Sequence, residues 1–291
     1  MVERSATVRW DTLYLIGGSA QDTLLLLPRL LASHARLLYV YDYSDAQVKA
    51  FDESGHLRWR FGRKGAGPGE FRNAWDLVVG PSGDVWVLDA SLQRLTVVSP
   101  RGQLVQLISL KAGRVKDVIS TSRETLGVVI APDEFLVTID STGAIAPVGG
   151  LPMAALRDVQ PTIRQTISSG APDGLTWAST FLWGRHILVF RGRTIQCRGE
   201  LIGAESFPET TQGTRAHALA IAVDGASVFV LRPPLERGAT STLDEYSVMS
   251  CEHTRTVGLP GAFYTMAASD GVFFLEKEDP APMILALQER R

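Results

Sequence analysis

The sequence has few of the side chains that build metal centres and disulfide frameworks. It contains two cysteines, five histidines and a single asparagine among 291 residues. Two cysteines cannot supply the multiple bridges of a small disulfide-stabilised domain. Zinc and calcium sites need several ligands that converge in space, and the histidines are scattered along the chain. The composition therefore predicts neither a bound metal nor another cofactor.

Long apolar runs and an excess of one charge are also lacking. The longest apolar candidate, Thr23 to Leu31, is interrupted by Pro28 and Arg29, which makes it too short to span a bilayer. The formal net charge is −2, so no overall field favours a nucleic-acid or membrane partner. We therefore expect no transmembrane segment, and a nucleic-acid partner is not favoured.

The first residues lack the pattern of a secretory signal. Met1 to Gly17 carries four charged side chains and has no apolar central region. Its second half, Thr7 to Ile16, alternates like a strand instead. A mature exported protein would also begin in this way, and we slightly favour a periplasmic or secreted location over a cytoplasmic one.

Short β-rich runs separated by turn residues are abundant, and the clearest series lies between residues 61 and 104. A glycine-rich connector, Gly62 to Asn73, precedes the apolar run Trp75 to Val79. A Pro-Ser-Gly-Asp turn then leads to Val85 to Asp89, and a polar link leads to Arg94 to Val98. Three such runs joined by turns predict a β-meander.

This series resembles one blade of the NHL-type six-bladed β-propellers. The resemblance rests on the connector FGRKGAGPGEF, on GDVWVLD and on RLTV, and it is weaker over the rest of the chain. It implies a ring of four-stranded blades. It implies little about function, because propellers serve in binding, scaffolding and catalysis alike.

The second strand of this blade recurs along the chain. The six copies are Leu37 to Asp42, Val85 to Asp89, Gly127 to Ala131, Ile187 to Arg191, Val228 to Arg232 and Val272 to Glu276. Their mean spacing of roughly 47 residues is typical of four-stranded blades. We therefore predict an all-β fold, in which residues 1–291 form one six-bladed propeller domain with antiparallel blades.

Two irregularities in the repeat give further expectations. Only one strand, Met283 to Leu287, follows the last copy, so Thr7 to Ile16 is predicted to complete that blade and close the ring. The spacing widens to about 60 residues between the third and fourth copies. We assign the excess to an insertion at about 151–175, interpreted as a lengthened loop, with a lid or partner contact as the alternative.

No catalytic constellation is recognisable in the sequence. Only His217 stands where a channel metal ligand would, whereas the amidating-lyase propellers use three histidines. Gluconolactonase-like propellers bind calcium through acidic and asparagine side chains, but Asn73 is the only asparagine, and Asp76 is better explained as bonded to backbone. We predict a non-enzymatic binding or scaffold propeller. The alternative is a lyase or hydrolase at the channel mouth, with or without a metal.

Cys197 and Cys251 fall in different blades, near the outer strands. The sequence does not give the distance between them. Two separate thiols are the favoured interpretation, and a disulfide in an oxidising compartment is the alternative.

Two sets of residues are predicted to contact a partner through the top face, where the inner strand of each blade begins. The first set combines cations with aromatic rings, as interface hot spots do, and comprises Arg63, Lys64, Glu70, Phe71, Arg72 and Trp75. The second set ends the repeated strands and comprises Asp42, Asp89, Arg191, Arg232 and Glu276.

The second set would give the mouth of the ring an acidic side at blades six, one and two and a basic side at blades four and five. Alternatively, each residue caps its own turn. The expected partner is another protein, and an extracytoplasmic part of a larger complex is one candidate. RNA binding, known in some NHL propellers, is less favoured because it would rest on one local cluster, Arg58, Arg60, Arg63, Lys64 and Arg72.

Overall fold

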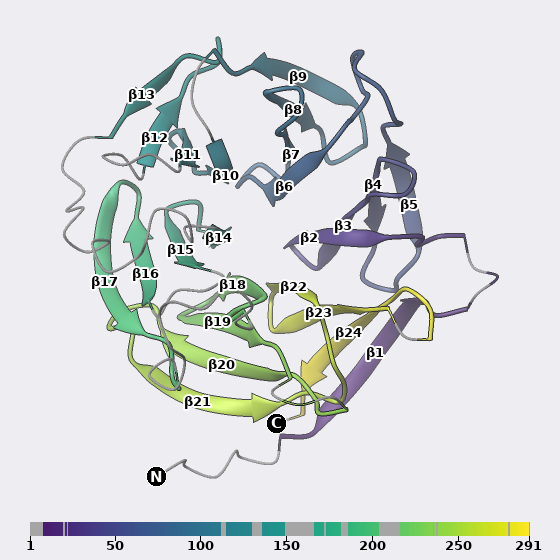
Figure 1. Ribbon diagram of the computed structural model, residues 1–291, viewed down its shortest axis with the longest axis vertical. Coiled ribbons are helices and arrows are strands. Elements are labelled where there is room, and N and C mark those ends of the chain that lie inside the picture. The colour runs from purple at the N-terminus through teal and green to yellow at the C-terminus, as the bar shows by residue number, and fades with distance from the viewer. Residues whose placement is uncertain are drawn as a thin grey trace.

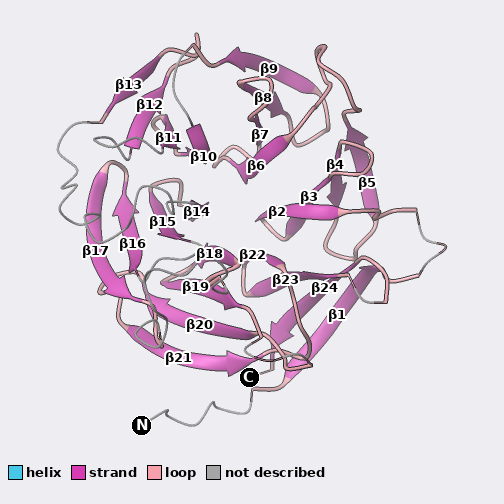
Figure 2. Cartoon of the chain, viewed as in Figure 1, coloured by secondary structure: helices cyan, strands magenta, loops and turns pink. Residues whose placement is uncertain are grey.

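Six four-stranded antiparallel sheets surround a central axis in the computed structural model (Figure 1). The structure describes residues 8–19, 21, 23–111, 115–129, 136–148, 166–171, 173–181, 186–203, 216–234, 236, 238–278 and 280–290. These residues form strands and loops without any helix (Figure 2). Within the same ranges, no helix could cross a membrane. The predicted all-β six-bladed propeller is confirmed.

Each blade follows the chain from the axis outward. Blades one and two consist of β2 (Pro28–His34), β3 (Leu37–Asp42), β4 (Gln47–Phe51) and β5 (Leu57–Phe61), then β6 (Ala74–Val79), β7 (Val85–Asp89), β8 (Arg94–Val98) and β9 (Leu104–Ser109). Blades three and four consist of β10 (Val115–Ser120), β11 (Thr125–Val129), β12 (Leu136–Ile139) and β13 (Ile145–Pro147), then β14 (Thr166–Gly170), β15 (Thr176–Phe181), β16 (His186–Arg191) and β17 (Thr194–Glu200). Blade five consists of β18 (Ala220–Asp224), β19 (Ser227–Arg232), β20 (Thr242–Ser247) and β21 (His253–Gly258).

Blade six is built from both ends of the chain. Its order is β1 (Trp10–Gly17), β24 (Met283–Glu289), β23 (Val272–Lys277) and β22 (Thr265–Ser269), with β1 antiparallel to β24. Figure 1 shows β1 along the outer side of β24. Ile16 is buried, and the ring of Trp10 meets that of Phe273 edge to face at 5.6 Å. Of the strand expected at Thr7 to Ile16, residues 10–16 belong to β1 and pair at the outer edge of the last blade, while Thr7 lies outside the described residues.

The repeat was assigned wrongly in blade four. Ile187 to Arg191 was expected to be a second strand, but β16 is the third, because β14 and β15 precede it in the sheet. β14 and β15 both lie in the region where the spacing of the predicted repeat is wider. β14 falls inside the expected insertion at about 151–175, and residues 149–165 lie outside the described residues.

The hydrophobic core lies between neighbouring blades. Between blades one and two, for example, Tyr41 and Val48 pack in one cluster with Phe71, Leu77 and Val87. The alternation of side chains along each strand places one side of every blade against the next. This packing fixes the inner strands and so positions the mouth of the ring.

Cys197 and Cys251 form a disulfide that joins blades four and five. The interpretation as two separate thiols is therefore wrong. The turn before the outer strand of blade five packs on β17, and Gly199 permits this approach, because a Cβ there would lie 2.3 Å from the carbonyl oxygen of Cys251. The same kind of turn in blade two brings Gly102 against Trp59 of blade one.

Candidate functional site at the mouth of the ring

The six inner strands surround a central cavity of about 260 Å³. Residues of β2, β6, β10, β14, β18 and β22 all line it. In each blade the first residues of the inner strand pair with the end of the second strand, as Ala74 does with Asp89 and Thr265 with Glu276. These ends define the top face, and the cavity opens among them.

A β-bulge interrupts the inner strand of each of the first three blades. The pairing with the second strand skips one residue between Pro28 and Leu30, between Ala74 and Asp76, and between Val115 and Asp117. The inner strands of blades four to six pair without such a shift. A bulge re-aims the extra side chain and is common beside functional sites.

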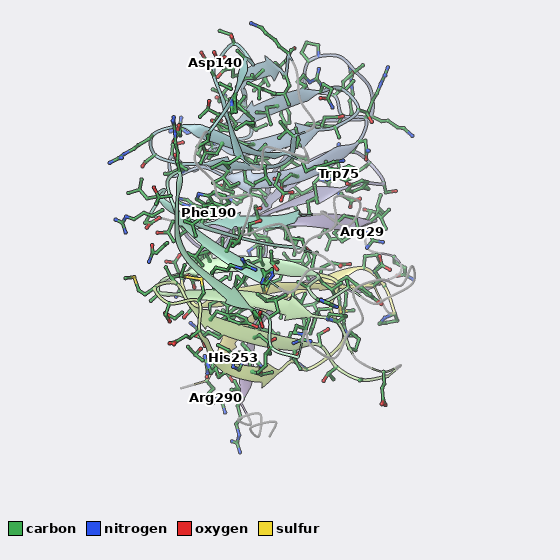
Figure 3. All side chains as sticks on the ribbon, turned by 60° about the vertical axis from the view of Figure 1, so that its left-hand side comes forward. Arg29, Trp75, Asp140, Phe190, His253 and Arg290 are labelled. Atoms are coloured by element: carbon green, nitrogen blue, oxygen red, sulfur yellow. A yellow bond between two sulfur atoms is a disulfide. The ribbon has the colours of Figure 1, made fainter. Side chains whose placement is uncertain are left out.

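The extra residues at the three bulges are Arg29, Trp75 and Lys116. The ammonium group of Lys116 lies 4.1 Å from the centroid of the Trp75 ring, which is a cation–π contact between blades three and two. Arg29 forms an ion pair with Glu278. Arg29 and Trp75 both line the cavity, and Figure 3 shows them on the same side of the molecule.

Two aspartates lie directly behind the bulges, inside the channel. Asp76 accepts hydrogen bonds from the amides of Leu77 (2.8 Å) and Val118 (2.7 Å), which confirms that its carboxylate is bonded to backbone. Asp117 accepts a hydrogen bond from the hydroxyl of Ser168 at 2.9 Å. These contacts tie the inner strands of blades two, three and four together.

The two carboxyl groups are close enough to affect each other's ionisation. Burial, and then the negative charge of Asp117, raise the pKa of Asp76 well above its ordinary value, against the two amide hydrogen bonds. A carboxyl of this kind can hold or donate a proton near neutral pH. His217 is buried just before β18, and no group of three or more metal ligands occurs among the residues that the structure describes.

The glycine-rich connector between blades one and two is held by internal contacts. Glu70 accepts hydrogen bonds from Arg63 (2.8 Å) and from the amides of Ala66 (2.9 Å) and Gly67 (2.7 Å). The guanidinium of Arg94 donates to the carbonyl oxygens of Ala66 and Glu70. The connector therefore has a defined conformation before any partner binds.

Phe71 and Glu70 have structural roles in the connector, and for Phe71 the sequence also allowed this alternative, a plug between blades one and two. Phe71 is fully buried and packs edge to face on Tyr41 and Phe61, with ring centroids 5.6 and 6.1 Å away. Gly62 makes room for it, since a Cβ at this positive-φ residue would lie 2.5 Å from the Phe71 ring. Phe71 cannot touch a partner, and the carboxylate of Glu70 is directed into its own loop.

Four of the six predicted connector residues remain accessible on the top face. Arg63, Lys64 and Arg72 are exposed, and Trp75 is half-buried. Within the described part of the chain, Arg63 is the one of these in a salt bridge, with Glu70 at 2.7 Å. Three cations of the connector are thus exposed, and one of them, Arg72, lies three residues before the bulged Trp75 in the chain.

Asp42 and Asp89 do not form the predicted acidic side of the mouth. Both are fully buried. Asp42 accepts hydrogen bonds from the amides of Leu26 and Leu27, and Asp89 accepts one from Arg72, so each fastens the connector that precedes its own blade. Amide hydrogen bonds, joined at Asp42 by the ammonium group of Lys49, thus occupy these carboxylates within the chain itself. The prediction that these two side chains contact a partner is wrong.

The other members of the second set also depart from the prediction. Arg191 ends a third strand, so it lies on the face opposite the mouth, where it is exposed. The guanidinium of Arg232 donates hydrogen bonds to the carboxylate of Asp244, at 3.2 Å, and to the carbonyl oxygen of Ile202. The predicted division of the mouth into an acidic and a basic side is therefore wrong. On blades one and two the aspartates Asp42 and Asp89 are buried, and the exposed charges of the top face include cations.

Glu276 is a buried carboxyl on the blade-six side of the mouth. Within the described part of the chain, neither of its carboxyl oxygens has a hydrogen-bond partner. Burial raises its pKa to about 8, which the charge of Arg29 opposes and the charge of Glu278 reinforces. Glu276 is therefore protonated at neutral pH, and it adds no negative charge to the mouth.

Replacing Glu276 by glutamine should stabilise the protein in alkaline solution. The unfolded chain releases this proton near pH 4.5, while the folded chain holds it up to about pH 8. Stability contributed by this group is complete below pH 4.5 and is lost as the pH rises through 8. We expect Glu276→Gln to raise Tm in alkaline solution by on the order of 5 °C and to leave it nearly unchanged in acid.

The matched control is the same substitution at Glu252, an exposed carboxylate on the turn before β21. Glu252→Gln should shift Tm by less than about 2 °C across the whole pH range. Parallel pH profiles of Tm for Glu276→Gln and the unmodified protein would contradict the assignment of a protonated carboxyl.

A second cavity of about 530 Å³ opens between blades one and two, away from the mouth. The rings of Tyr39 and Trp59, 5.8 Å apart, and the side chains of Arg58 and Arg101 line it. The indole of Trp59 donates to the carbonyl oxygen of Pro100 at 2.9 Å, which fixes the ring. Strands and turns of two blades contribute these residues, so no short sequence motif marks the cavity.

No family model and no curated protein matches the chain. Solved structures match over almost the whole chain. A putative exported protein from Bacteroides fragilis is 12% identical, with 100% of this chain and 98% of that chain covered and a TM-score of 0.62. A member of the DUF4221 family from Bacteroides vulgatus is 9% identical, with 99% and 100% covered and a TM-score of 0.63.

An enzyme is also among the similar structures. A streptogramin B lyase is 13% identical, with 95% of this chain and 98% of that chain covered and a TM-score of 0.57. At such identities the likeness establishes the fold alone, because one fold carries many functions. The chain is therefore a six-bladed β-propeller, and the solved structures similar to it include both a putative exported protein and a lyase.

Proposed function

We propose that the protein is a non-enzymatic binding propeller that engages another protein through its top face. The observation that carries this proposal is the connector between blades one and two, which presents Arg63, Lys64 and Arg72 on an internally bonded loop. A loop that is already ordered loses little conformational entropy on binding. Arginine beside an aromatic ring, here Arg72 near Trp75, is the composition enriched at interface hot spots.

An oxidising compartment fits this role. The disulfide between Cys197 and Cys251 is typical of proteins outside the cytoplasm. Similarity to a putative exported protein supports the same location. The expected partner is then an extracytoplasmic protein or an extracytoplasmic part of a larger complex.

Replacing the three connector cations should abolish partner capture without unfolding the protein. We expect Arg63→Ala/Lys64→Ala/Arg72→Ala to lower Tm only slightly, because exposed charges contribute about 0–1 kcal/mol each. Capture of the partner from a native extracytoplasmic extract, measured by affinity purification, should fall at least tenfold.

The matched control removes three exposed cations from turns on the opposite face, with Arg36→Ala/Arg101→Ala/Arg123→Ala. This control should capture the partner like the unmodified protein. Equal capture by the two triple variants would place the interface elsewhere and refute the role of the connector.

The alternative is a lyase or hydrolase with its active site at the channel mouth. The raised pKa of Asp76 beside Asp117 favours it, because such a carboxyl can act as a general acid. Ser168, bonded to Asp117, lies in the same channel. Metal analysis of the purified protein tests the metal-dependent form, since stoichiometric zinc or calcium would favour the enzyme.

A further inference from the structure

The mouth of the ring has one sector that is structurally distinct from the rest. Blades one to three carry a bulge at the start of the inner strand, and the described residues of the inner strands in blades four to six show none. The bulges present Arg29, Trp75 and Lys116 from three consecutive blades. β-Bulges are over-represented beside functional sites, where they re-aim a side chain.

The charges of this sector are predominantly positive. Arg72 is exposed next to Trp75, and Lys116 is held over the Trp75 ring. Four acidic groups lie nearby, and each is engaged or has a raised pKa. Glu278 is paired with Arg29, and burial raises the pKa of Glu276 to about 8. Behind the bulges, Asp76 accepts two amide hydrogen bonds and Asp117 accepts one from Ser168. The net charge of the whole chain is −2, so this positive sector is a local feature.

We propose that this sector, formed by Arg29, Arg72, Trp75 and Lys116, binds an acidic extended segment of the partner protein. The inference rests on the proposed binding function and specifies the chemistry of the partner. Trp75 offers an apolar surface for the backbone or an aliphatic side chain of the segment. Lys116 and Arg72 offer charge-assisted hydrogen bonds to its carboxylates.

The size of the cavity agrees with a segment that lies across the mouth. A volume of about 260 Å³ admits one or two side chains but no folded element. Complementary charge at the rim then selects the partner and accelerates its association, and both effects weaken as salt is added.

A labelled hexaglutamate peptide tests the proposal directly by fluorescence anisotropy. We expect it to bind the full-length protein, with an affinity that falls steeply as salt increases, while a hexalysine peptide does not bind. Arg72→Ala/Lys116→Ala should weaken hexaglutamate binding at least tenfold. The charge-matched control Arg101→Ala/Arg123→Ala, on the opposite face, should bind like the unmodified protein. Thermal melts confirm that each variant is folded.

The outcomes separate this inference from the proposed function. Equal loss of binding in both double variants, or no loss in either, overturns the assignment of the sector. No hexaglutamate binding to the unmodified protein overturns it too, and if the native partner is still captured through the connector, the proposed function stands. Loss of partner capture by the control triple variant would instead refute the proposed function.

Discussion

A chain without residues 1–17 is expected to aggregate, or to melt at least 10 °C below the intact protein. The deletion removes β1, whose pairing with β24 runs from Trp10 opposite Glu289 to Gly17 opposite Met283. It uncovers the edge of β24 and exposes the apolar surface that Ile16 and Trp10 cover. Each buried side chain of this size contributes about 1.5–3 kcal/mol, and an uncovered strand edge pairs readily with another chain.

Differential scanning calorimetry and light scattering of the two proteins measure this effect. Deletion of residues 1–7 is the control, because it leaves β1 (Trp10–Gly17) in place. The control should melt like the full chain. If the longer deletion also melted like the full chain and stayed monomeric, pairing of β1 with β24 would contribute nothing to closure of the ring.

The sequence predicts the strands well where turn residues mark both ends. β3 and β7 begin and end at the residues expected from the repeat, because each apolar run is followed by an aspartate and a short polar loop. Blade four shows the limit of this reasoning. There β16 is as apolar as a second strand, and only the pairing shows that it is the third.

The candidate site is harder to predict, because pairing and side-chain direction decide it. Arg29 interrupts an apolar run in the sequence, and nothing there shows that β2 skips it in pairing with β3. Lys116 likewise stands in an ordinary strand pattern until the bulge in β10 separates it from its neighbours. Trp75 was predicted as a contact residue from composition, and its place over the channel comes from the same kind of bulge.

Residues at equivalent positions of the repeat also take different roles. Asp42, Asp89 and Glu276 all lie at the ends of second strands and are all buried. The two aspartates bond amides of the preceding connector. In blade six the amide of Phe263 donates its hydrogen bond to the hydroxyl of Ser241 instead. Glu276 therefore lacks this stabilisation of its charged form, and burial raises its pKa to about 8. Sequence position fixes the location of such a side chain, and the neighbouring backbone fixes its charge.

The buried lysine of blade one should be essential for stability. Lys49 is fully buried, and its ammonium group contacts Asp42 at 2.8 Å and Asp45 at 2.7 Å. Burial alone would raise the pKa of Asp42, but the Leu26 amide and Lys49 together hold it below its ordinary value. Replacing Lys49 by methionine keeps the volume and removes the charge, which leaves a buried carboxylate without its counterion. Such a change costs about 3–5 kcal/mol.

We therefore expect Lys49→Met to lower Tm by on the order of 10 °C, measured by circular dichroism. Lys111→Met is the matched control, because Lys111 is exposed and its ammonium group donates to the Thr142 hydroxyl at 3.1 Å. It should change Tm by less than about 2 °C. Adding Asp42→Asn to Lys49→Met should recover part of the loss, since it removes the uncompensated charge. A double variant that melts well below Lys49→Met would show that Asp42 acts through its amide hydrogen bonds, and not through its charge.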